Sequence, residues 1–309
     1  MEFIRDIYNI TAKHHGCVAT IGNFDGVHLG HQRILQNLNA KAKQLNLPSL
    51  LITFEPLALE FFLKDNRLAR LMRLREKLMV LQEYSVDRVL CLKFNEQLAS
   101  LTAEAFVKSL LVEKLGIRHL IVGDDFCFGK NRQGDFNLLK HLSEQYQFAV
   151  SNTETILLNG ERVGSSRVRQ ALAVGDFALA KQLLGRPYSM GGHVIHGDKR
   201  GRQLGFPTAN ILLKRLLSPL HGVFAVKVHG VISQTLFGVA NLGRRPTVDG
   251  HKQLLEVYLL DFQQSIYGKF LQIEFIQKIR DEQRFASVDL LKQQIEQDVE
   301  SAKKILGVF

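Results

Sequence analysis

Two histidines stand three positions apart in a glycine-containing segment near the start of the chain. Residues 22–31 read G-N-F-D-G-V-H-L-G-H, and the histidines are His28 and His31. Residues three apart share one face of a helix, and a helix start presents unpaired N–H groups to a phosphate. Two imidazoles there can donate hydrogen bonds as charge grows on phosphate oxygens. The glycines, Gly22 and Gly26, let the backbone turn sharply and approach a ligand.

Other interpretations of this segment compete with a phosphate site. A metal site is the weaker hypothesis, because no carboxylate or cysteine nearby completes a ligand set of the zinc type. An ordinary helix start stays open, since H-x-x-H alone is common. Neither a Walker A loop nor a G-x-G-x-x-G fingerprint occurs in this region. The whole string, with both glycines and an aspartate, still favours phosphate binding.

Two later segments also carry groups that bind phosphate. Residues 163–169 read V-G-S-S-R-V-R, so hydroxyls and guanidiniums crowd a predicted helix start. A serine N-cap beside surface arginines is the plain alternative. Residues 197–210 read G-D-K-R-G-R-Q-L-G-F-P-T-A-N, where glycines and basic residues can cradle a phosphate. In an extended segment, Thr208 and Asn210 would point the same way and suit Mg²⁺ carried on a nucleotide. The alternative is a basic hairpin with a G-F-P turn.

The elements around these segments change character near residues 185–187, which read G-R-P. Before this point apolar strands alternate with helices, which predicts a parallel sheet covered by helices. After it, short strands follow one another, which predicts an antiparallel barrel. We predict domains at 1–185 and 186–309. The predicted strands are 17–21, 50–54, 86–92, 118–122, 148–150, 193–195, 222–229, 234–240, 254–260 and 271–279. The predicted helices are 28–45, 102–115, 166–174, 177–184 and 287–306.

Two of these helices show further local signals. Thr102 is a good N-cap for its helix, and Ser287 for the last one. The last helix is amphipathic. We expect its buried stripe to consist of Leu290, Leu291, Ile295 and Val299.

Composition limits the class of protein. The chain has 309 residues, enough for two domains, and a net charge of +10, which favours anionic partners. Three cysteines far apart, without metal spacing, fit a reduced, cytoplasmic protein. No signal peptide or membrane-spanning run is found, so we expect no membrane partner. A nucleic-acid-binding protein is the rival class, but no recognition helix, RNP aromatics or zinc module supports it, and we expect no nucleic acid.

The motifs together resemble a known family. The first string and residues 163–169 resemble the signatures of the nucleotidylyltransferase superfamily. The form G-N-F-D-G-V-H-L-G-H-Q, followed by V-G-D-D-F-C-F-G at 122–129, looks like the bacterial bifunctional riboflavin kinase and FAD synthetase. The run at 197–210 resembles the riboflavin kinase signature G-x-x-x-G-F-P-T-A-N. Residues 238–247, 255–261 and 279–285 match further family segments in the same order.

This resemblance implies a fold and two reactions. The fold is an α/β N-terminal domain of the Rossmann-like nucleotidylyltransferase type, followed by a mostly antiparallel six-stranded β-barrel with a terminal helix. The C-terminal domain would phosphorylate riboflavin to FMN, and the N-terminal domain would adenylylate FMN to FAD and release pyrophosphate. ATP, riboflavin, FMN and FAD are then substrates or products, and both steps would need Mg²⁺. The partners are small molecules, and self-association is left open.

The resemblance also assigns residues. Glu256 would be the general base of the kinase, where the plain alternative is a strand carboxylate. The catalytic groups of adenylylation would be His28 and His31. Other residues would contact ATP in the N-terminal domain: Gly22, Phe24, Asp25, Gly26, Ser165, Ser166 and Arg169. ATP and Mg²⁺ in the C-terminal domain would be bound by Gly201, Gly205, Thr208 and Asn210. The flavin contacts would be Asp125, Phe126, Phe128, Arg280 and Phe285.

The chain departs from the family pattern at a few positions. Gly164 stands where the family has serine, and Leu57-Ala58 stands where it has His-Pro after F-E-P. These departures suggest an alternative function, a riboflavin kinase with a weak or decayed adenylyltransferase domain.

Overall fold

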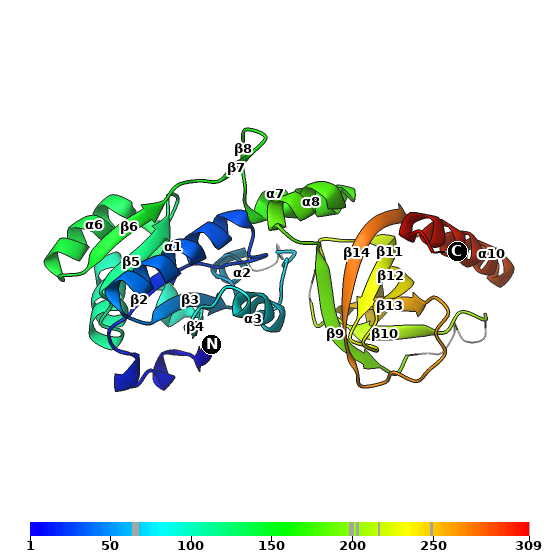
Figure 1. Cartoon of the computed structure of the whole chain (residues 1–309), viewed down its shortest axis with the longest axis horizontal. Coiled ribbons are helices and arrows are strands. Elements are labelled where there is room, and N and C mark those ends of the chain that lie inside the picture. The colour runs from blue at the N-terminus through cyan, green and yellow to red at the C-terminus, as the bar shows by residue number, and fades with distance from the viewer. Residues whose placement is uncertain (64–67, 198–200, 202–203, 216, 248–249, 309) are drawn as a thin grey trace. The chain divides into compact units, whose positions relative to one another are not determined.

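The first part of the chain is built around a parallel sheet (Figure 1). The computed structural model describes residues 1–63, 68–197, 201, 204–215, 217–247 and 250–308. Within these, six parallel strands pair in the order β1-β4-β3-β2-β5-β6. Their bounds are Glu2–Arg5 (β1), Val18–Ile21 (β2), Ser49–Glu55 (β3), Arg88–Lys93 (β4), His119–Gly123 (β5) and Ala149–Thr153 (β6). The central strands are apolar and buried, as expected for a parallel sheet with both faces covered.

Helices connect these strands. The α-helices are Leu29–Leu45 (α1), Ala58–Leu63 (α2), Leu74–Gln82 (α3), Glu96–Ala99 (α4), Ala103–Phe106 (α5) and Phe136–Gln145 (α6). Short 3₁₀ turns occupy Ile7–Asn9, Ala12–His14 and Lys130–Arg132. A small hairpin, β7 (Leu157–Leu158) and β8 (Glu161–Arg162), projects from the sheet (Figure 1).

The helix predicted at 102–115 forms in a modified way. Thr102 is its N-cap, and the hydroxyl accepts a hydrogen bond from the N–H of Ala105 at 3.1 Å. After α5 the backbone continues as a π-helix, Val107–Lys114. Periodicity could not reveal this, because the change of winding keeps Val107, Leu110 and Leu111 buried.

The later part of the chain contains a closed barrel. Its strands pair antiparallel in the order β10-β13-β12-β11-β14-β9. Their bounds are Ser189–Ile195 (β9), Thr208–Leu212 (β10), Gly222–His229 (β11), Leu236–Thr247 (β12), Gly250–Leu259 (β13) and Phe270–Arg280 (β14). The helices of this part are Ser165–Val174 (α7), Phe177–Leu184 (α8) and Val288–Leu306 (α10). The predicted fold class, an α/β domain followed by an antiparallel barrel with a terminal helix, is confirmed.

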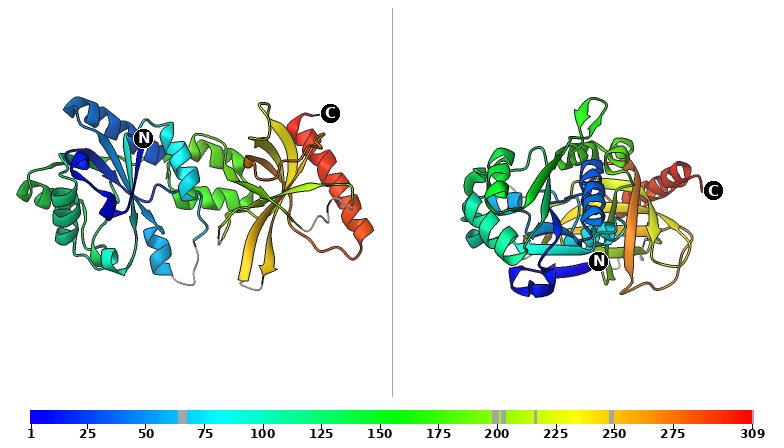
Figure 2. Two further views of the ribbon diagram at one scale, coloured as in Figure 1. Left: turned by 90° about the horizontal axis from the view of Figure 1, so that it is seen from below. Right: turned by 60° about the vertical axis from the view of Figure 1, so that its left-hand side comes forward.

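Helix α10 lies against the outside of the barrel (Figure 2). Ser287 caps it, since its hydroxyl accepts a hydrogen bond from the N–H of Leu290 at 3.2 Å. The predicted buried stripe is wrong at Leu290, which is 49% exposed. The first turn carries that side chain away from the barrel, and Val299 and Ala302 form the buried part of the stripe.

The chain packs as two compact units. The first unit is Met1–Leu68 with Lys77–Gly164, and the second is Ala69–Glu76 with Ser165–Phe309. The second unit therefore contains a short segment from the first half of the sequence. The predicted domain limits, 1–185 and 186–309, stay a prediction about the functional domains.

Candidate active sites

The first candidate site is the turn between β2 and α1. His28 is the N-cap of α1, and its Nδ1 accepts a hydrogen bond from the N–H of His31 at 3.4 Å. The two rings stack with centroids 3.6 Å apart. Because Nδ1 is the acceptor, the neutral His28 ring carries its proton on Nε2. The two predicted histidines thus lie together at a helix start that follows a parallel strand, where phosphates bind well.

The backbone before His28 is tightly folded. Gly26 has a φ of +87°, as predicted for a sharp turn, but Phe24 and Val27 also have positive φ values, +47° and +43°. Gly22 does not have a positive φ, so its predicted role in ligand approach stays a prediction. Gly22 instead makes room for the ring of Phe24, which would lie 3.2 Å from an added Cβ. Phe24 is buried with its ring centroid 4.7 Å from that of His31.

The residues predicted to contact the flavin in the N-terminal domain, and the predicted ATP contact Asp25, differ in how exposed they are. The side chain of Asp125 is exposed and forms an ion pair with Arg162 of β8 at 2.9 Å. Phe126 stacks on Phe128 at 5.5 Å, and Phe128 is buried in the core. Asp25 is buried as well.

Three predicted triphosphate contacts belong to the second unit. Ser165 and Ser166 begin α7, and Arg169 follows one turn later. The Nε of Arg169 donates to the carbonyl of Ala69 at 2.7 Å. A hydrogen bond to a main-chain carbonyl fixes the direction of this guanidinium.

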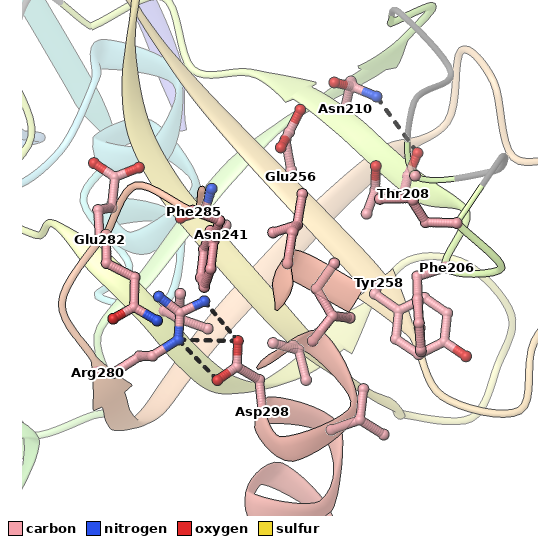
Figure 3. A pocket seen from close by; sticks show the side chains of 18 residues that line it. Phe206, Thr208, Asn210, Asn241, Glu256, Tyr258, Arg280, Glu282, Phe285 and Asp298 are labelled. Carbon is pink, nitrogen blue, oxygen red and sulfur yellow. Dashed lines mark hydrogen bonds and ion pairs between the residues drawn. The ribbon is translucent and has the colours of Figure 1, made fainter. Parts of the chain in front are cut away.

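The second candidate site is a cavity of about 390 Å³ between the outside of the barrel and α10 (Figure 3). It holds most of the residues that the sequence predicts for the C-terminal domain. The lining residues are Gly201, Leu204, Phe206, Thr208, Asn210, Val223, Val239, Asn241, Glu256, Tyr258, Arg280, Glu282, Gln283, Phe285, Leu291, Ile295, Asp298 and Val299.

Glu256 sits at the centre of the polar lining. In the strand register it lies opposite Asn210 of β10 on one side and Asn241 of β12 on the other. Directly opposed residues of antiparallel strands point to the same face, so the three polar side chains share one surface. In Figure 3 the carboxylate points into the cavity. Glu256 therefore faces away from the barrel core, as a strand carboxylate would, but it faces a cavity instead of open solvent.

Thr208 and Asn210 lie beside this carboxylate, both on β10 and both lining the cavity. The amide Nδ2 of Asn210 donates to the carbonyl of Thr208 at 3.4 Å. Its Oδ1 is buried and has no hydrogen-bond partner among the described residues. A buried, unpaired amide oxygen beside a hydroxyl suits a hard cation, because Mg²⁺ takes oxygen ligands.

The opposite side of the cavity is held by an ion pair. The Nε and Nη2 of Arg280 donate to both carboxylate oxygens of Asp298 at 2.8–3.1 Å (Figure 3). Arg280 also lies over the ring of Phe285, 5.7 Å from its centroid. Across the cavity, Phe206 meets Tyr258 edge to face at 5.3 Å.

The lining residues that sequence reasoning did not name include the polar Asn241, Glu282 and Asp298. Partial burial raises the pKa of the Glu282 carboxyl, Arg280 and Asn241 oppose the rise, and Glu256 adds to it. Asn241 could have been found, because it stands in the matched segment 238–247. Asp298 had no sequence signal, since a carboxylate on a terminal helix is ordinary until a partner faces it.

The glycines of the predicted phosphate cradle differ in position. Gly201 lines the cavity, whereas Gly205 is in an exposed turn with a φ of +88°. The basic residues Lys199, Arg200 and Arg202 lie outside the described residues. Within the part of the chain that the structure describes, no group of three His, Cys, Asp or Glu side chains is arranged to hold a metal ion.

Family models match both parts of the chain. The model of FAD synthetase matches residues 10–167, and that of riboflavin kinase matches residues 184–306. The two family matches thus define a transferase with two activities in one chain.

Whole-chain relatives specify the family. The chain is 50% identical to the bifunctional riboflavin kinase/FMN adenylyltransferase of Escherichia coli (strain K12) over 309 residues, which is 100% of this chain and 99% of that protein. It is 48% identical to the Haemophilus influenzae protein of the same name, with 98% of each chain covered. The chain belongs to the bifunctional riboflavin kinase/FMN adenylyltransferase family. The FAD synthetase match and these relatives favour a bifunctional enzyme over a kinase with a decayed second domain.

A solved structure shares the fold. It is described as a macrolide-efflux protein from Streptococcus pneumoniae and is 29% identical, with a TM-score of 0.82 over 98% of this chain and 99% of that one. Among the described residues of the present chain, none of the helices has the length and apolar character needed to cross a membrane.

Proposed function

We propose that riboflavin and ATP bind in the cavity between the barrel and α10, and that Glu256 removes the proton of the riboflavin 5′-hydroxyl. The observation that carries this proposal is the register of β13, which places the Glu256 carboxylate between Asn210 and Asn241 inside the cavity. A carboxylate held by two strands is a well-oriented general base. The resulting oxygen nucleophile attacks the terminal phosphorus of ATP, and ADP leaves.

Thr208 and Asn210 hold the Mg²⁺ that accompanies ATP. The buried Oδ1 of Asn210, which has no hydrogen-bond partner among the described residues, supports this role. The metal ion supplies neutralisation of the charge on the transferring phosphoryl group. Gly201 and Gly205 give the backbone room to approach the phosphates.

Arg280 and Phe285 bind the flavin ring system. Arg280 is held by Asp298, so its direction does not depend on a ligand. The apolar part of the lining, which includes Val223, Val239 and Ile295, offers a surface for a flat aromatic ring.

Adenylylation takes place at the turn before α1. Ring N–H groups of His28 and His31 donate to ATP phosphate oxygens as negative charge builds up on them. Gly22, Phe24, Asp25 and Gly26 line the ATP pocket. A phosphate oxygen of FMN forms a bond to the α-phosphorus of ATP, and the bond to pyrophosphate breaks. No side chain forms a covalent intermediate, so positioning carries most of the catalysis.

The remaining contacts of this reaction follow the family resemblance. Ser165, Ser166 and Arg169 bind the triphosphate, and Asp125, Phe126 and Phe128 bind FMN. The functional domains are 1–185 and 186–309. The free cysteines support a cytoplasmic location, because a reducing compartment keeps thiols unpaired.

Two substitutions test the assignment of the two sites. His31→Ala should abolish FAD formation while FMN formation persists, and Glu256→Gln should do the reverse when FMN is supplied. Chromatography of reactions with riboflavin, ATP and Mg²⁺ measures both products. Equal loss of both activities in either folded variant would refute the assignment.

A further inference from the structure

Lys77 is a buried lysine of α3 that neither proposed reaction uses. Its side chain is among the largest that are fully buried, and the residue is 1% exposed. The ammonium Nζ donates to the carbonyl oxygen of Asn23 at 2.6 Å and to the hydroxyl of Thr53 at 3.1 Å. The Thr53 hydroxyl lies 3.3 Å from the same carbonyl and donates to it. Two side chains from different elements therefore converge on one main-chain oxygen.

Burying an ammonium group costs free energy. Desolvating a charge costs more than burying an apolar side chain of the same size, and replacing buried charges by apolar groups is often stabilising. The position of Lys77 under the turn between β2 and α1 points to a different use.

That turn needs to be held. Directly after Asn23, Phe24 and Val27 adopt positive φ values that side-chain-bearing residues rarely adopt. Such backbone persists only where the surroundings over-determine it, and it gathers at functional sites. At the far end of the turn, the Nε2 of Gln32 donates to the carbonyl of Val27 at 2.9 Å. The strained turn is thus pinned at both ends, by Lys77 and by Gln32.

The turn leads directly into the helix start that carries the two histidines. His28 follows Val27 directly, and its ring caps the helix that carries His31. We propose that Lys77 is a positioning residue for adenylylation, which holds Asn23 and thereby sets the backbone that places His28 and His31 for ATP. The inference rests on the proposed ATP site at this turn.

The test replaces the ammonium but keeps the length of the side chain. Lys77→Met removes the donor to Asn23, and Lys140→Met, at an exposed lysine of α6, is the matched control. Small displacements of positioned groups can cost about a hundredfold in rate, so kcat/KM for adenylylation of FMN should fall by about that factor. The KM for ATP in this reaction should rise. FMN formation by the same preparation, and its KM for ATP, should stay at the wild-type values, as should both activities of Lys140→Met.

A milder variant guards against a simple folding defect. Thr53→Val keeps the shape of a buried side chain and removes one of the two donors to Asn23. Its KM for ATP should rise in adenylylation by less than that of Lys77→Met. Unchanged KM values in both variants, or equal loss of both enzyme activities in both, would overturn the positioning role.

The proposed site is tested separately by His31→Ala. If that variant keeps FAD formation, the site assignment fails and the role of Lys77 fails with it. If His31→Ala abolishes FAD formation while Lys77→Met and Thr53→Val behave as the wild type, only the positioning role fails.

Discussion

Replacing Glu76 by alanine removes the negative half of a buried ion pair in the second unit. The Oε2 of Glu76 accepts from the Nη2 of Arg215 at 2.5 Å, and Oε1 accepts from the N–H of Gly191 on β9 at 2.8 Å. Nη1 of Arg215 donates to the carbonyl of Leu71 at 3.1 Å and contacts the hydroxyl of Tyr188 at 3.3 Å. Burial alone would lower the pKa of the Arg215 guanidinium, but Glu76 and Tyr188 outweigh it and raise the pKa.

The size of the effect follows from what is left behind. The Arg215 side chain is 1% exposed, so Glu76→Ala leaves a desolvated charge and the N–H of Gly191 without their acceptor. Breaking a buried pair by removing one partner costs about 3–5 kcal/mol. For a unit of this size each kcal/mol lowers the melting temperature by about 2–4 °C. We therefore expect a fall of about 6–20 °C in the melting temperature of the second unit.

The assay is thermal unfolding of the full chain, with residual FMN formation after heating as the report on the second unit. Glu76→Met combined with Arg215→Met removes both charges and should recover most of the loss. Glu300→Ala is the control, because its pair with Lys303 is exposed and is worth at most about 0.5 kcal/mol. A shift for Glu76→Ala as small as the control's, or a double variant no more stable than Glu76→Ala, would refute the reasoning.

Three further predictions concern the first unit. Burial lowers the pKa of His119, so the contribution of this residue to stability is present above pH 6.5 and is lost as pH falls below that value. Melting temperatures measured at several pH values should therefore show a smaller acid-induced loss for His119→Gln than for the wild type. An equal loss in the two proteins would contradict this prediction. Burial raises the pKa of Cys17 to about 12 and that of Cys91 to about 11, whereas Cys127 is exposed. A thiol reagent should therefore label Cys127 first. A fast phase of labelling that survives in Cys127→Ser would disprove this. Gly164→Ser restores the family hydroxyl at a position where an added Cβ meets no atom within 4 Å. FAD formation should therefore be kept or increased without a change in melting temperature. A loss of FAD formation would count against the family comparison at this position.

Much of the fold could be predicted because the local signals were unambiguous. Continuous apolar runs such as 50–54 lie in a buried parallel strand, and the strand 222–229 has the predicted bounds. Thr102 and Ser287 cap helices as expected, because a hydroxyl at such a position bonds to the free N–H groups of the first turn. Helix α3 was not predicted, although its sequence consists mostly of good helix formers; what the sequence could not show is which partners Glu76 and Lys77 meet in the folded chain.

Residue types and their spacing were enough to predict the chemistry that the chain offers: histidines three apart after a strand, a glutamate on a strand, and a threonine and an asparagine two apart. These follow from residue type and spacing, which local geometry converts directly into direction. The folded chain was needed to show that Glu256 lies between Asn210 and Asn241, that Asp298 orients Arg280, and that Lys77 bonds to the turn before His28. Those relations join residues far apart in the chain. Strand register and burial set them, and no local pattern encodes either.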